Sequence, residues 1–299
     1  MFDFRYHVAS LAAVFVALII GILVGVGLSG QGFVTDSERD KLEGDIEQLR
    51  SALESEQNRA DGLEQGQRAG SELAQASYPL LMADRLRGKR ISLVVVGSPE
   101  DGGVTGEVRR AIADAGGRVL RTYALRVPVD PAAIEKTLRG RPALAGYMGA
   151  DHLDDLGRDL GRELVQEGPT PLLDALEDDL VEERFGPPDV GADGVVVVRT
   201  AAPQAGSSAD FVNGLYGGVA SAGQPAIGVE ATDSLPSAVP AFSRRRLSTV
   251  DNVDSPIGRL SLALLLSGAE PGHYGVKDSA DAILPRIEPL PDEPTDGGG

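Results

Sequence analysis

The sequence predicts an α/β protein built from an N-terminal transmembrane helix, a coiled-coil stalk and a mainly parallel, doubly wound sheet domain. An uncharged apolar run, a heptad repeat and an alternation of β-branched runs with amphipathic segments predict this order. The expected boundaries within the 299 residues are 1–7 for a short cytoplasmic N-terminus, 8–28 for the transmembrane helix, 29–77 for the stalk, 78–284 for the α/β domain and 285–299 for a disordered acidic tail.

Residues 8–28 carry no charge and a single hydroxyl, on Ser10. A helix of this length crosses the ~30 Å hydrocarbon core of a bilayer. A cleaved signal peptide is an alternative, but its apolar region usually spans only about 7–15 residues. A buried helix of a soluble domain is another, although charged, amphipathic sequence follows at once. Gly21 and Gly25 form a GxxxG pair, which either lets two helices approach closely or reflects the frequency of glycine in membrane spans.

Apolar residues with spacings of four, three, four, seven and three follow the span and predict a heptad seam that Glu56 interrupts. The seam residues are Leu42, Ile46, Leu49, Leu53, Ala60 and Leu63. A parallel homodimer through the stalk would cover this seam, and the alternative is a single helix folded back on its own domain. Gly62, Gly66 and Gly70 weaken the helix and predict a hinge.

Short runs rich in valine predict buried parallel strands in the α/β domain, and helical periodicity separates them. Strands are expected at 91–97, 118–125, 144–148, 194–199 and 226–230, and helices at 104–115, 131–138, 152–166, 172–183, 209–222 and 256–267. Asp130 is the expected N-cap before Pro131, and Asp254 or Ser255 the N-cap of the last helix, which Gly268 ends.

The composition excludes several classes of function. The formal net charge of −17 disfavours nucleic acid as a partner. The absence of cysteine excludes disulfides, thiolate zinc sites and thiol catalysis. With three histidines and no assembled triad, no enzyme activity and no cofactor are expected.

Two groups of residues are weak candidates for binding a metal. The first combines Asp151, His152 and Asp155 with the neighbouring Asp154 and Asp159. Hard cations prefer such oxygen ligands, but acids at a helix N-terminus also complement the helix dipole without any ligand.

The second group contains Asp251 and Asp254 in a V-D-N-V-D pattern, together with His273 in G-H-Y-G. Helix capping and turn formation explain the two carboxylates more simply than a metal does. A loop docked on the core is the simpler explanation of His273.

Gly97–Gly106 follow the first expected strand, where doubly wound folds hold ligands. The segment matches neither G-x-G-x-x-G nor a P-loop, and Glu100 and Asp101 would repel a phosphate. A plain surface turn is favoured, with a small-molecule sensor as the alternative.

Two segments resemble the MctB-type copper transporter family of actinobacteria. They are F-R-Y-H-V-A-S-L-A-A-V-F-V-A-L with the G-I-L-V-G that follows, and L-S-T-V-D-N-V-D-S-P-I-G-R-L with G-H-Y-G beyond it. The resemblance implies a single-pass cell-envelope protein with its bulk outside the cytoplasm and a role in copper efflux or homeostasis, where a pore-forming role has been proposed. The charges around the span leave this orientation open. Related proteins are also linked, with a partner protein, to control of cell-wall hydrolysis and division.

Copper enters as a ligand through this resemblance alone. Cu(I) selects sulfur ligands, and the chain offers three isolated methionines, Met1, Met82 and Met148. No ligand residue of the family carries over to a position in this chain. The alternative function is therefore a non-enzymatic, dimeric scaffold that controls envelope or division machinery through a partner protein.

Overall fold

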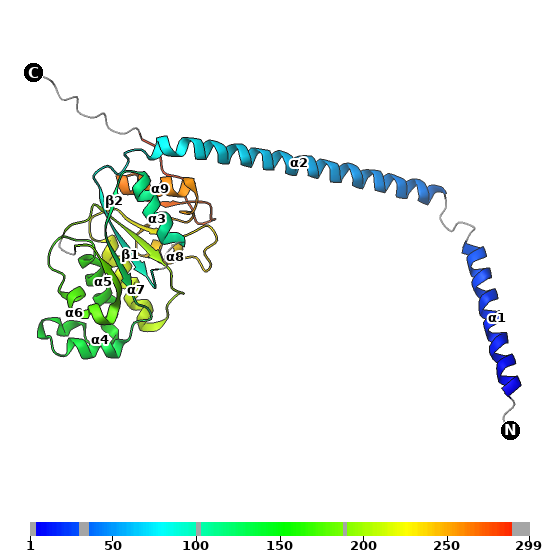
Figure 1. Cartoon of the computed structure of the whole chain (residues 1–299), viewed down its shortest axis with the longest axis horizontal. Coiled ribbons are helices and arrows are strands. Elements are labelled where there is room, and N and C mark those ends of the chain that lie inside the picture. Colours follow the sequence, from blue (N-terminus) through cyan, green and yellow to red (C-terminus); the bar gives the residue numbers. More distant parts are fainter. Residues whose placement is uncertain (1–3, 30–35, 100–102, 188–189, 289–299) are drawn as a thin grey trace, which may run out of the picture. The chain divides into compact units, whose positions relative to one another are not determined.

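The computed structural model describes residues 4–29, 36–99, 103–187 and 190–288, in two compact units, Met1–Gly70 and Ser71–Gly299 (Figure 1). Most of the acidic tail predicted at 285–299 lies outside the described residues.

The first unit contains helix α1 (Phe4–Ser29) and most of helix α2 (Asp36–Met82). The side chains described in α1 are exposed, and nothing lies within 4 Å of a Cβ built at Gly21 or Gly25. Among the residues described, no helix combines the length and the hydropathy that crossing a bilayer requires. The transmembrane helix at 8–28 therefore stays a prediction.

Helix α2 continues through Gly62, Gly66 and Gly70, and the boundary between the two units falls directly after Gly70. The hinge at these glycines stays a prediction. Its predicted seam faces solvent, with Leu49 69% and Leu53 60% exposed. Its last residue, Met82, is fully buried in the core of the second unit.

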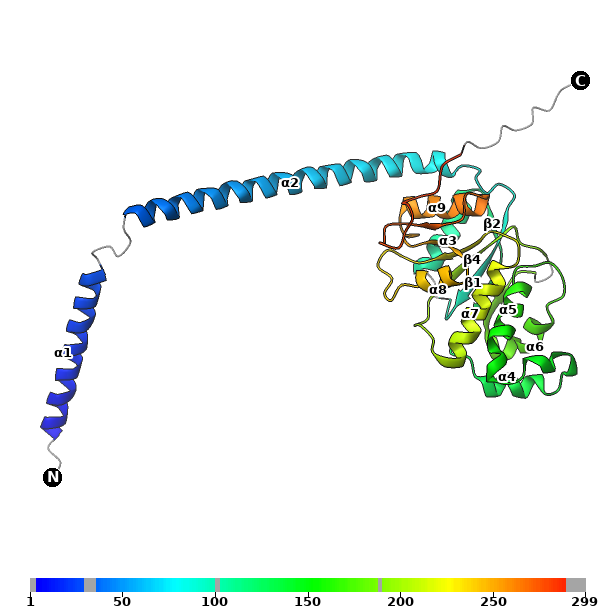
Figure 2. The ribbon, with the colours of Figure 1, turned by 180° about the vertical axis from the view of Figure 1, so that it is seen from behind.

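The second unit is built on one seven-stranded sheet in the order β3-β2-β1-β4-β5-β6-β7 (Figures 1 and 2). β3 pairs antiparallel with β2, and all other neighbours are parallel, which confirms the mainly parallel sheet. The strands are β1 (Arg90–Val96), β2 (Arg118–Leu125), β3 (Val181–Phe185), β4 (Gly194–Arg199), β5 (Ala226–Val229), β6 (Ser248–Val250) and β7 (His273–Tyr274).

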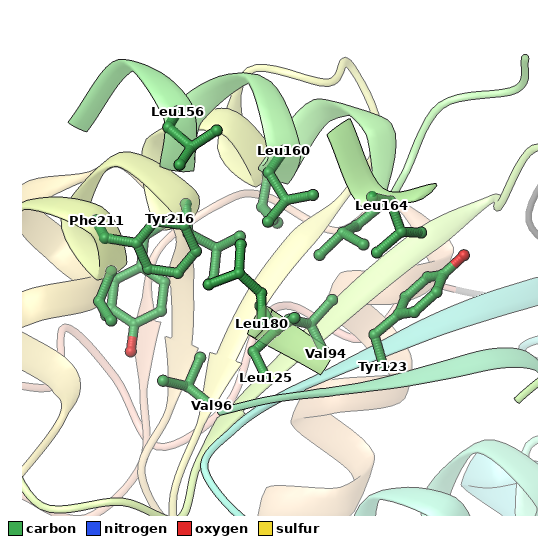
Figure 3. Close-up of a cluster of buried hydrophobic side chains, with 14 of the residues drawn as sticks. Val94, Val96, Tyr123, Leu125, Leu156, Leu160, Leu164, Leu180, Phe211 and Tyr216 are labelled. Atoms are coloured by element: carbon green, nitrogen blue, oxygen red, sulfur yellow. The ribbon is translucent and has the colours of Figure 1, made fainter. Parts of the chain in front are cut away.

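Helices cover both faces of this sheet because successive residues of a strand point to opposite faces. On one face Val94 and Val96 pack with α4 to α8, in the cluster drawn in Figure 3. On the other, Leu93 and Val95 pack with α3 and α9. The helices are α3 (Gly103–Asp114), α4 (Pro131–Leu138), α5 (Leu153–Glu163), α6 (Pro171–Leu180), α7 (Gly206–Ala220), α8 (Val239–Arg244) and α9 (Pro256–Ser267), with 3-10 turns η1 (Pro142–Tyr147) and η2 (Ala150–His152).

The predicted helix caps are present. Asp130 accepts hydrogen bonds from the backbone N–H groups of the first turn of α4. Of the two candidates before α9, Ser255 is the cap and accepts a 3.0 Å hydrogen bond from the N–H of Gly258. Gly268 ends α9 in the left-handed conformation, with φ of 108°.

The expected strand at 144–148 is wrong, because these residues lie mostly in η1. A short apolar run does not distinguish strand from helix, and Pro142 favours the first position of a helical turn. The helix predicted at 172–183 ends at Leu180, and Val181 begins the edge strand β3. β6, β7 and α8 were not predicted.

Helices α5 and α7 cross at very short range through paired glycines. A Cβ at Gly157 would lie 2.1 Å from the carbonyl oxygen of Phe211, and one at Gly218 would lie 2.0 Å from that of Arg158. Gly161 and Gly214 are equally confined. The close crossing therefore requires glycine at these four positions.

Candidate functional site

Arginine side chains pair with three acids of the cluster at the start of α5, Asp154, Asp155 and Asp159. Asp151 and His152 lie in the exposed turn η2. Asp155 pairs with Arg158 at 2.6 Å, and Asp154 forms a second ion pair with the same guanidinium.

Asp154 and Asp159 have further protein partners. Asp154 also pairs with Arg245 at 2.9 Å, and Asp159 pairs with Arg162 and accepts a 2.7 Å hydrogen bond from the hydroxyl of Tyr147. Burial and this bond raise the pKa of Tyr147 to about 12. Within the described ranges, no three His, Cys, Asp or Glu side chains gather closely enough to hold a metal ion.

Asp251 and Asp254 hold loops at the carboxyl end of the sheet. The carboxylate of Asp251 is 1% exposed and accepts hydrogen bonds from the N–H groups of Val276 (2.8 Å) and Lys277 (3.1 Å). Asp254 accepts bonds from the N–H and hydroxyl of Thr232, at 2.8 and 2.9 Å. Both carboxylates therefore bind backbone N–H groups of neighbouring loops.

His273 lies in β7, which pairs parallel with β6, rather than in a loop docked on the core. Its Nδ1 lies 3.0 Å from the hydroxyl of Thr249 and 3.4 Å from that of Ser243. His273 therefore lies on the edge strand of the sheet, where its Nδ1 contacts two neighbouring hydroxyls.

The loop after β1 makes a tight contact with the segment after β4. Gly97 has φ of 116°, and a Cβ there would lie 2.5 Å from the hydroxyl oxygen of Thr200. The hydroxyl of Thr200 in turn donates to the carbonyl of Ser98 at 2.9 Å. The predicted turn residues Glu100 and Asp101 lie outside the described residues.

A crevice of about 280 Å³ opens beside this contact, at the carboxyl ends of β1 and β4 and between α7 and α8. At this point the connections that follow β1 and β4 leave in opposite directions, to β2 and to β5, and such a point is the usual place for a ligand in a doubly wound sheet. The lining residues with polar side chains are Arg199, Gln204, Asn213, Tyr216, Ser237 and Arg244.

The sequence favoured a plain surface turn after Gly97, with a ligand site there only as the alternative. The lining instead comes from the segment after β4 and from two helices. Arg199 could have indicated this crevice from the sequence. It is the first charged residue after four valines, and a charge at the carboxyl end of a buried strand marks this edge of the sheet.

Comparisons with known proteins agree on one protein family. The family described as "Copper transport outer membrane protein, MctB" matches residues 1–285. Proteins named "Copper transporter MctB" from Mycobacterium bovis and from two strains of Mycobacterium tuberculosis are 25% identical over 325 aligned residues, which cover 95% of this chain and 99% of each relative.

The fold and the site define a class of protein with an apolar N-terminal helix, a long charged helix and a doubly wound α/β domain. The chain belongs to the MctB family. That family is named for transport and for the outer membrane, not for catalysis.

Proposed function

We propose that this protein is a membrane-anchored envelope protein with a role in copper efflux or homeostasis. The observation that carries the proposal is the family match across nearly the whole chain, with relatives named copper transporters. The uncharged run at 8–28 supports anchoring by one span. The envelope role in the family's name favours the N-terminus inside and the bulk of the chain outside the cytoplasm.

The donor set favours an indirect role in copper handling. Cu(I) prefers sulfur, and the chain has no cysteine and three methionines. Met82 is fully buried in one core cluster, and Met148 packs against the other. Assembly or a partner protein would then supply the path for copper.

Cell-associated copper in a strain lacking the gene, measured after a copper load, tests this role. Excess copper that returns to normal on complementation with the wild-type gene is the expected result. Unchanged copper in the deletion strain would refute the role.

A second complementation separates direct from indirect handling. The double variant Met148→Leu, His152→Ala removes an isolated sulfur and an exposed imidazole without touching an ion pair. An indirect role predicts that this variant restores normal copper as fully as the wild type. Failure to restore copper, at equal protein abundance, would identify a direct ligand.

A dimeric scaffold that binds an envelope partner is the second candidate, and the exposed seam of α2 favours it. Leucine side chains at heptad spacing that are 60% or more exposed in a single chain, such as Leu49 and Leu53, gain stability when a second copy covers them.

Because the native chain has no cysteine, single cysteines report the dimer without background. In a parallel, in-register coiled coil, Leu53→Cys forms an intermolecular disulfide in the membrane under mild oxidant. Ser51→Cys, on the opposite face of the helix, does not. Equal crosslinking of both variants would argue against the seam.

A further inference from the structure

The crevice between α7 and α8 is not used by the proposed copper or scaffold role. We propose that it binds a small organic anion. The carboxylate or phosphate of this ligand would lie between Arg199 and Arg244, and its uncharged part would contact Asn213 and the hydroxyl of Tyr216.

The charge of the crevice is opposite to that of the chain. Two arginines line it, and no Asp or Glu is among its described lining residues, although the formal net charge is −17. Arg244 makes no ion pair with any described residue, whereas the adjacent Arg245 pairs with Asp154. Arg199 donates to the carbonyl of Pro236 at 2.5 Å, which orients its guanidinium without neutralising it. An anion would supply the missing charge-assisted bonds.

Tyr216 supplies an independent observation that points to a ligand. It is 1% exposed, and its hydroxyl has no hydrogen-bond partner in the described part of the chain. Buried polar groups in native proteins are normally bonded, so an orphan hydroxyl in a ligand crevice calls for a bound group. Burial raises the pKa of this phenol, and the charge of Arg199, which lines the same crevice, opposes that effect.

The remaining walls indicate an organic ligand rather than an inorganic ion. Val96, Ala209, Val212, Pro240 and Ala241 present apolar surface to the crevice. The volume of about 280 Å³ matches the lower end of small-molecule pockets. A bare anion would leave this surface uncovered, whereas a ligand with a short carbon skeleton would bury it.

Isothermal titration of the full chain in detergent, with malonate, 2-phosphoglycolate, inorganic phosphate and uncharged malonamide, tests the proposal. We expect saturable binding of malonate or 2-phosphoglycolate with Kd of about 1 mM or tighter. Inorganic phosphate should bind more weakly, and malonamide should not bind. The stronger of the two organic anions identifies the carboxylate or the phosphate as the recognised group.

Arginine variants connect the binding to the crevice. Arg244→Gln should weaken the organic anion about tenfold, as loss of a charge-assisted bond does. Arg246→Gln removes the same charge from an exposed position outside the crevice and should leave Kd unchanged.

The hydroxyl of Tyr216 gives a readout that separates binding from folding. Tyr216→Phe should weaken the organic anion several-fold, while the melting temperature of the ligand-free protein stays the same or rises, because the orphan hydroxyl is gone. Lack of saturable binding by all four probes, or equal losses in Arg244→Gln and Arg246→Gln, would overturn the proposal.

Discussion

The rings of Tyr216 and Phe242 meet edge to face, with centroids 5.0 Å apart and an interplanar angle of 64°. This contact joins α7 to α8, the two helices that flank the crevice. Phe242 in turn covers Gly228 of β5, where a Cβ would lie 2.3 Å from the ring. Packing of Phe242 between Tyr216 and Gly228 therefore connects both helices that flank the crevice to the sheet.

Phe242→Ala should lower the free energy of unfolding by about 3–5 kcal/mol, because it leaves a cavity and removes the edge-to-face contact. Urea unfolding of the full chain, followed by near-UV circular dichroism of the tyrosines, measures this change. Phe185→Ala is the matched control, since Phe185 is 63% exposed and its loss should cost little. Similar losses in both variants would contradict a structural role for the Phe242 contact.

Two neighbouring glycines of α7 test how closely α5 and α7 approach each other. Gly218→Ala should destabilise the protein by about 1–3 kcal/mol or more, because its Cβ would meet the carbonyl oxygen of Arg158. Gly217→Ala meets nothing closer than 3.7 Å and should stabilise α7 by up to about 1 kcal/mol. Thermal unfolding that shifts in the same direction for both variants would show that α5 and α7 do not approach this closely.

Asp251→Ala removes the acceptor that holds the chain after β7. It should cost about 1.5–3 kcal/mol of stability, since two backbone N–H groups lose a charged partner. Hydrogen exchange should rise at the amides of Val276 and Lys277. Asp278→Ala, a nearby exposed carboxylate without a hydrogen-bond partner in the described chain, should change neither the stability nor the exchange.

Asp193 makes stability depend on acidic pH. Burial by itself raises the pKa of this carboxyl, but hydrogen bonds from the N–H and guanidinium of Arg90 (2.8 and 3.2 Å) outweigh it, and the net pKa is lowered. A lowered pKa stabilises the fold above the unfolded value of about 3.9 and loses that stability as pH falls through the folded value. The stability gap between wild type and Asp193→Asn should therefore be present at pH 7 and shrink below about pH 4. A gap that grows on acidification would contradict this assignment.

Glu56 interrupts the seam of α2, so Glu56→Leu should tighten the proposed dimer by about 1.5–3 kcal/mol per buried side chain. Sedimentation equilibrium of the full chain in density-matched detergent measures the dissociation constant. Glu54→Leu removes the same charge on the far side of the helix and should leave the constant unchanged. Equal tightening in both variants would indicate non-specific association.

The long valine-rich strands were predictable because each is a continuous run of β-branched residues. β1 and β4 are buried on both faces and have no alternation to obscure them. β6 and β7 contain three and two residues, too few for any periodicity, and they are strands because β6 pairs with β5 and β7 pairs with β6. The start of β3 continues a helical pattern and was therefore predicted as helix. Pairing with β2 overrides this local preference.

The residues that line the crevice could not be predicted from the sequence. Arg199, Tyr216 and Arg244 are far apart in sequence, and the β4–α7–β5–α8 crossovers bring them to one crevice. The acids proposed as weak metal ligands are held by arginines and backbone N–H groups that no spacing rule could pair with them in advance.

The glycines at the crossing of α5 and α7 also provide reference positions for sequence alignments in a family whose members diverge to 25% identity. Inserting one residue between Gly157 and Gly161 would rotate one of them by about 100° away from α7. Insertions and deletions in relatives should therefore fall outside these two intervals. Gly157–Gly161 and Gly214–Gly218 mark fixed points from which the variable loops of distant homologues can be measured.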